Sequence, residues 1–134
     1  MTTPHPHPET DPLDALFFSA TDYARDIAKV LRGLVKIDGD FVIFTEGMTV
    51  ANKILCYLLA VKVMQLTGRR ATDEASPNDI ERETKIVGNT LRPLLLKLAE
   101  KGLIHKVRDG IYKANTTHLY KSAIFLGAHY GRWQ

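Results

Sequence analysis

The sequence of 134 residues contains one cysteine, Cys56. A single cysteine excludes a disulfide within the chain, which favours a reducing compartment. The first residues, MTTPHPHPETDP, have neither the positive n-region nor the apolar h-region of a signal peptide. The longest apolar-rich run, Ile54 to Met64, is too short to cross a bilayer and contains Lys62. We therefore expect no membrane association and a cytoplasmic location.

The motifs of common enzyme classes are also missing. The sequence has no Walker loop, no GxGxxG after a predicted strand, no HExxH and no CxxC pair. His105, His118 and His129 have no Cys, Asp or Glu near them at ligand spacing, and His5 and His7 alternate with prolines. We therefore predict that the protein is not an enzyme and uses neither a metal nor a cofactor.

Positive charge is scarce in the first part of the chain and concentrated in the rest. Residues 1–48 carry four Lys/Arg against eight Asp/Glu, whereas residues 49–134 carry fourteen against seven. Residues 85–113 alone contain seven Lys/Arg against two acids. Such a basic segment is typical of a protein that binds a polyanion. The alternative is a solvated face of ordinary lysines and arginines.

The first part of the chain is predicted to hold a tail and a long helix. Residues 1–11 are rich in Pro, His and Thr without periodicity, which predicts a disordered tail. Apolar residues then recur every three or four positions from Leu13 to Leu34, which predicts a helix over residues 12–37. A turn at Asp38-Gly39-Asp40 and a short strand over 41–44 follow, from turn chemistry and from β-branched and aromatic residues.

Two further helices are predicted outside the basic segment. Thr49 can cap a helix that runs to Leu66 and is apolar on nearly every side, which indicates a central core helix. Cys56, within this helix, is interpreted as a buried small apolar residue. A last helix is expected over residues 116–130, with a buried stripe of Tyr120, Ala123, Ile124 and Gly127. Residues 12–134 are thus predicted to form one domain.

Residues 76–114 read SPNDIERETKIVGNTLRPLLLKLAEKGLIHKVRDGIYKA and contain two helices and a hairpin. Ser76-Pro77 provides a helix cap followed by proline at the first helical position. A second helix should begin at Gly88 or Asn89, with Asn89 as the better cap, and end at Gly102. Asp109-Gly110 predicts a β-hairpin turn. Inward positions of the second helix would be Leu91, Leu95 and Leu98.

This order of elements resembles the winged helix-turn-helix superfamily. The resemblance covers residues 49–114, where a Ser-Pro-started helix precedes a Leu-rich helix closed by Gly-Leu-Ile. It implies an α+β, mainly α fold with a winged-helix core. Here that core would be extended by the long N-terminal helix and the C-terminal helix. Many members have Gly at the position of Lys85. Glycine is common there because that turn often needs φ > 0.

The resemblance implies that the second helix reads the major groove of double-stranded DNA and that the hairpin forms a basic wing. The outward side of that helix would then carry Asn89, Thr90, Arg92 and Lys97. Asn can bind adenine and Arg can bind guanine, whereas Thr90 and Lys97 suit phosphates. Asn89 could equally be a plain helix cap. The wing would offer Lys106, Arg108 and Lys113.

Pro93 and Leu96 fit a groove-reading helix less well. Proline inside a helix lacks an N–H, and an outward leucine is typical of a protein interface. The main expectation is a transcriptional regulator that is associated with the nucleoid and binds DNA as a homodimer through the N-terminal helix, the C-terminal helix or both. The alternatives are a winged-helix module that binds a protein at Pro93 and Leu96, and a plasmid- or phage-type replication or partition factor.

Overall fold

The computed structural model describes residue 16 and residues 19–130 of the chain. Within these residues the fold is α+β and mainly helical, with five helices and two small antiparallel hairpins. The predicted tail, residues 1–11, and the predicted helix start at Pro12 lie outside the described residues. Among the residues described, none of the helices combines the length and hydrophobicity needed to cross a membrane.

Helix α1 spans Ala20–Leu31 and is shorter than predicted. Its N-cap is Ser19, whose Oγ accepts a hydrogen bond from the backbone N–H of Asp22 at 3.0 Å. The prediction of one helix over residues 12–37 is wrong at its end, because Gly33 takes a φ of 82° and turns the chain. The residues that follow form a strand.

Strands β1 (Val35–Asp38) and β2 (Phe41–Phe44) form an antiparallel hairpin that pairs Asp38 with Phe41. The turn and the second strand were predicted, but β1 was not. Val35 and Ile37 share the inner face of the hairpin with Val42, as the register shows. Phe41 and Ile43 lie on the outer face and are exposed.

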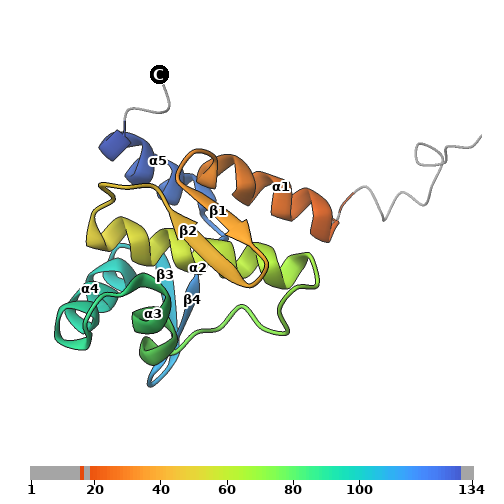
Figure 1. Ribbon diagram of the computed structural model, residues 1–134. Helices are drawn as coiled ribbons and strands as arrows, with labels where there is room; N and C mark the ends of the chain where they lie inside the picture. The colour runs from red at the N-terminus through yellow and green to blue at the C-terminus, as the bar shows by residue number, and fades with distance from the viewer. Residues whose placement is uncertain (1–15, 17–18, 131–134) are drawn as a thin grey trace, which may run out of the picture.

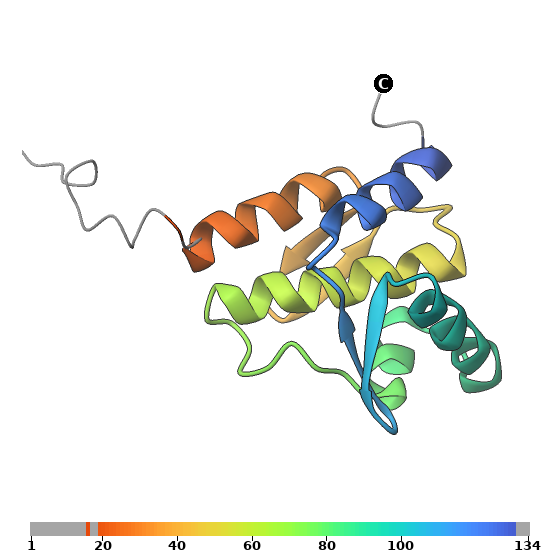
Figure 2. The ribbon, with the colours of Figure 1, turned by 180° about the vertical axis from the view of Figure 1, so that it is seen from behind.

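Helix α2, Val50–Leu66, is the centre of the molecule, and the prediction of a core helix capped by Thr49 is confirmed. Ten of its residues are buried, including Cys56 and Tyr57. Figures 1 and 2 show α1 and α5 on one side of α2, and α3, α4 and the β3–β4 hairpin on the other. Each layer therefore buries its apolar face against the same helix.

The layer on the other side of α2 consists of α3 (Pro77–Thr84), α4 (Gly88–Glu100), β3 (Ile104–Arg108) and β4 (Ile111–Ala114). Gly102, with a φ of 77°, follows α4 as predicted. The chain then enters β3, and the turn at Asp109-Gly110 joins β3 to β4. A backbone bridge between Ala75 and Tyr112 ties the segment before α3 to the outer edge of β4.

Helix α5, Leu119–Tyr130, begins three residues after the predicted start at residue 116. Its predicted stripe is confirmed at Gly127, which is buried, and at Ala123, which packs against the core, but it is wrong at Tyr120 and Ile124, which are 60% and 64% exposed. Ser122 and Leu126 are the fully buried residues instead. Asn115 fixes the approach to α5, since its amide donates to the Gly102 carbonyl at 2.8 Å and accepts from the Thr117 N–H at 3.1 Å.

Candidate nucleic-acid interface

The N-terminus of α3 is held by a reciprocal pair of hydrogen bonds. The Asp79 N–H donates to Ser76 Oγ at 3.2 Å, and the Ser76 N–H donates to Asp79 Oδ2 at 3.1 Å. Burial raises the pKa of Asp79, but the hydrogen bonds from Ser76 and the charge of Arg82 outweigh burial and leave this pKa below its usual value. The predicted Ser-Pro helix start is confirmed, and it fixes the position of α3.

The turn between α3 and α4 passes through Lys85 in the left-handed conformation, with a φ of 64°. Most L-residues adopt this conformation at a cost of about 1–2 kcal/mol, so the turn stores the strain that lysine in place of glycine predicts. Thr84 Oγ1 donates to the Ile80 carbonyl at 2.6 Å, and Ile86 is buried. The turn is therefore anchored on both sides of the strained residue.

Helix α4 begins at Gly88 with Val87 as its N-cap residue, and no side chain caps it. The prediction that Asn89 caps this helix is therefore wrong. Asn89 lies in the first turn with an exposed side chain. Because Gly88 can begin the helix without a side-chain cap, Asn89 is left to face solvent.

The two sides of α4 are divided as predicted. Leu91, Leu95 and Leu98 are buried in the core. The opposite side is exposed and carries Asn89, Thr90, Arg92, Pro93, Leu96 and Lys97. Four of the predicted site residues thus lie on one solvent-facing side of one helix.

Pro93 is the sixth residue of α4, deeper in the helix than a cap at Asn89 would place it. Proline has no N–H, so the carbonyl of Asn89, four residues earlier, receives no α-helical hydrogen bond from it. That carbonyl remains as an acceptor near the exposed start of α4. Pro93 itself is exposed, and therefore does not fill the core.

The β3–β4 hairpin carries the other three predicted residues. Lys106 and Arg108 are exposed on β3, and Lys113 is half-buried on β4. Lys106 Nζ lies 3.2 Å from Asp109 Oδ1, and Arg108 Nη2 lies 3.1 Å from Glu74 Oε1. These acids offset part of the positive charge predicted for the hairpin. Both pairs are solvent-exposed, and such pairs contribute only about 0–1 kcal/mol.

A cleft of about 420 Å³ joins these elements. Arg92 and Leu96 of α4 line one wall, and Gly110 and Tyr112 of the hairpin line another. The start of α3 completes the cleft with Ser76, Pro77 and Asn78. Of the predicted site residues, the cleft contains Arg92 alone. Sequence reasoning missed Asn78 and Tyr112, because only the fold brings the α3 start next to the hairpin.

The charges around α4 are mixed on the side towards α3. Arg92 Nη1 and Glu81 Oε1 both lie 3.4 Å from the position that a Cβ on Gly88 would occupy. The carboxylate of Glu81 therefore lies near the guanidinium group of Arg92. Further along α4, Lys97 is exposed, and no ion pair within the described residues includes it. Its charge is available to a partner.

Within the described part of the chain, no group of three or more His, Cys, Asp or Glu side chains is placed to hold a metal ion. Comparison of the chain with protein-family models, with curated proteins and with solved structures found no match. The geometry and charge of this face are therefore the basis for its proposed function.

Proposed function

We propose that residues 49–114 form a winged helix-turn-helix that binds double-stranded DNA. In this proposal α4 enters the major groove and the β3–β4 hairpin is the wing that contacts the phosphate backbone. The observation that carries the proposal is the shared cleft. Arg92 and the outer side of α4 face the same space as the turn of a projecting basic hairpin. A helix and a hairpin arranged in this way can contact a groove and its backbone together.

Asn89 and Arg92 are the proposed base-reading residues. Because Val87 is the N-cap residue of α4, the side chain of Asn89 is not required as a cap and can bind adenine. Arg92 can bind guanine through O6 and N7, and a good bidentate contact contributes about 1–3 kcal/mol of discrimination. Thr90, at the exposed start of the helix, is assigned to a phosphate.

Lys97, Lys106, Arg108 and Lys113 are the proposed phosphate-binding residues, and would provide most of the salt-dependent affinity. Arg108 and Lys106 must exchange their contacts with Glu74 and Asp109 for phosphates. Both contacts are exposed ion pairs, so the exchange costs little. We expect Lys97 and Lys113 to contribute more per residue, since neither forms an ion pair within the described residues.

We further propose that the protein acts in transcriptional control as a cytoplasmic, nucleoid-associated homodimer without catalytic activity. Support for a dimer comes from α5, where Tyr120 and Ile124 are 60% and 64% exposed. Large apolar side chains on the outer side of a helix are typical of an interface. Helix α1 packs in the same layer and would extend this surface (Figure 2). A replication or partition factor would use the same face on a different operator.

The second candidate function is protein docking through α4. Leu96 and Val87 are 53% and 58% exposed, and both belong to the α4 region. Phosphate contact requires neither of these exposed apolar side chains, and Leu96 in the middle of α4 would suit a partner protein. Docking predicts binding that depends on Leu96 and changes little with salt, whereas DNA binding predicts a steep salt dependence.

The test measures the affinity of the full chain for mixed-sequence duplex DNA by fluorescence anisotropy over a range of salt concentrations. We expect binding that weakens steeply as salt rises. Arg108→Ala should lower the slope of log K against log salt by about 1 and weaken binding to all sequences. Arg92→Ala should instead reduce the preference for selected sequences, at a cost of about 1–3 kcal/mol.

Arg25→Ala is the matched control. Arg25 is an exposed arginine of α1 paired with Asp22 at 3.3 Å, in the layer on the other side of α2. Its substitution should leave the affinity and the slope unchanged. The absence of salt-dependent binding of the wild-type chain to any duplex at low ionic strength would refute DNA binding and favour the docking function.

A further inference from the structure

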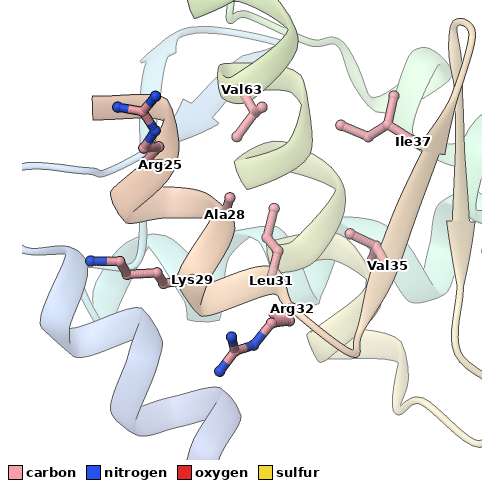
Figure 3. Close-up of a pocket in the computed structure, with 8 residues that line it drawn as sticks. All are labelled: Arg25, Ala28, Lys29, Leu31, Arg32, Val35, Ile37 and Val63. Carbon is pink, nitrogen blue, oxygen red and sulfur yellow. The ribbon is translucent and has the colours of Figure 1, made fainter. Parts of the chain in front are cut away.

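An apolar groove lies between α1, β1 and α2, outside the candidate interface. Its volume is about 450 Å³, within the range of small-molecule sites. Figure 3 shows Val63 of α2 pointing into the space between α1 and β1, with Val35 and Ile37 facing it from β1. Leu31 and the small Ala28 complete the apolar lining from α1. We call this space the α1–β1 groove.

Among the described residues, every charged side chain that lines the α1–β1 groove is a cation. These residues are Arg25, Lys29 and Arg32. Their charged ends lie away from the apolar centre, around the edge that α1 forms (Figure 3). A mostly apolar pocket with a few polar groups at one edge is typical of a ligand site. The groove therefore matches a molecule with an apolar body and one negative end.

Within the described part of the chain, the ion pairs of two of these cations are weak. Arg25 Nη1 lies 3.3 Å from Asp22 Oδ1, and Lys29 Nζ lies 3.9 Å from Asp26 Oδ1. The side chains of Arg25 and Lys29 are 70% and 75% exposed, so these pairs contribute little. Asp22 also lies in the first turn of α1, where the helix dipole favours a carboxylate. It does not depend on Arg25 for stabilisation.

The dipole of α1 also favours one orientation of a bound ligand in the groove. Arg32 follows the last residue of α1, where the backbone carbonyls carry partial negative charge. An anion is therefore less favoured beside Arg32 than beside Arg25, which lies more than one turn before that end, and Lys29 of the last turn lies between them. The negative group should meet Arg25 and Lys29, and the apolar body should extend towards Val35 and Ile37.

We propose that the α1–β1 groove binds a free amphipathic monocarboxylate, with its alkyl chain on Val35, Ile37 and Val63 and its carboxylate at Arg25 and Lys29. This site goes beyond the proposed DNA-binding function and does not depend on it. The ligand is a small molecule in solution, because the volume of the groove is in the range of small-molecule sites.

The test uses decanoate as the probe and follows the methyl resonances of the full chain by NMR during titration. Decanoate should shift the methyl groups of Val35, Ile37 and Val63 in a saturable manner. Ala28→Trp fills the groove and should abolish these shifts. Ala20→Trp is the matched control, because Ala20 is an exposed α1 residue that does not line the groove, and decanoate binding should be unchanged.

A second pair of variants tests the charge. Arg25→Gln with Lys29→Gln should weaken decanoate binding about five- to tenfold, the effect of two partly exposed charge contacts. The same variant should bind decanol as the wild type does, because decanol lacks the carboxylate. Lys36→Gln removes a cation that does not line the groove, and it should change the binding of neither decanoate nor decanol.

Three results would overturn the proposal. The first is decanoate binding that persists in Ala28→Trp. The second is a set of shifts centred on Tyr120 and Ile124 of α5, which would indicate general adsorption to exposed apolar side chains. The third is a wild-type dimer that Ala28→Trp converts to a monomer in sedimentation, with no decanoate binding. That result would make a second copy of the chain the occupant of the groove.

Discussion

Both β-hairpins turn through a glycine of positive φ, and they differ in how their first or second strand is exposed. In the β1–β2 hairpin Gly39 has a φ of 63°, and in the β3–β4 hairpin Gly110 has a φ of 75°. Both hairpins lie against α2, where β2 buries Val42 and β4 buries Tyr112 and Ala114. In β3, by contrast, only Ile104 is buried, and every residue from His105 to Arg108 is exposed.

Their exposed sides differ in chemistry as well. The outer face of the β1–β2 hairpin presents Phe41 and Ile43, whereas the outer face of the β3–β4 hairpin pairs His105 with Lys113. Both hairpins thus contribute to the core, but only the β3–β4 hairpin also extends a strand with a polar, cationic outer face towards solvent. Tertiary placement, rather than the hairpin itself, decides which of them can contact a polyanion.

The two hairpins should differ most in how much a valine-to-alanine substitution lowers the free energy of unfolding. Val42→Ala in the β1–β2 hairpin should lower the free energy of unfolding by about 1–3 kcal/mol, because the side chain is 7% exposed and its loss leaves a cavity. Val107→Ala in the β3–β4 hairpin should cost less than about 0.5 kcal/mol, since Val107 is 37% exposed. Urea denaturation of both variants measures the two costs. Equal costs would mean that β3 packs as closely as β2.

The two turns should respond alike to alanine substitution, because both contain a glycine of positive φ. At Gly39 and at Gly110 an added Cβ meets nothing within 4 Å, so only backbone strain opposes alanine. Gly39→Ala and Gly110→Ala should therefore each lower the free energy of unfolding by about 1–2 kcal/mol. Thermal unfolding monitored by circular dichroism gives both values. A much larger cost at one turn would show that strain alone does not describe it.

The hairpins also show why one was predicted and the other only in part. In β3–β4, charged and apolar residues on both sides of Asp109-Gly110 fit a strand and no helix. Before Asp38, Leu31 and Leu34 still fit a helical spacing, while Val35 and Ile37 also fit the alternation of a strand. Periodicity cannot choose between these readings in a short segment. Gly33, with its φ of 82°, is the signal that the helix has ended.

In the candidate interface, the buried and exposed sides of α4 could be predicted because the leucine spacing alone determines them. The N-cap residue could not be predicted, because Val87 begins α4 without a side-chain hydrogen bond, whereas a sequence ranks caps by their side chains. The prediction of the buried side of α5 was wrong in part. Hydrophobicity favours Tyr120 and Ile124, but the core buries the polar Ser122 together with Leu126. The cleft depends on the Ala75–Tyr112 bridge, a contact between distant segments.

The smallest effect concerns one lysine in each hairpin. Lys113 of β4 and Lys36 of β1 both lie on the outer face of their hairpin, as the strand registers show. If the β3–β4 hairpin contacts phosphates, Lys113→Gln should lower the slope of log K against log salt by about 1 in DNA-binding measurements. Lys36→Gln should leave that slope unchanged, although both variants lose the same charge. A similar decrease in both variants would show that net charge, and not the placement of the β3–β4 hairpin, governs the salt dependence.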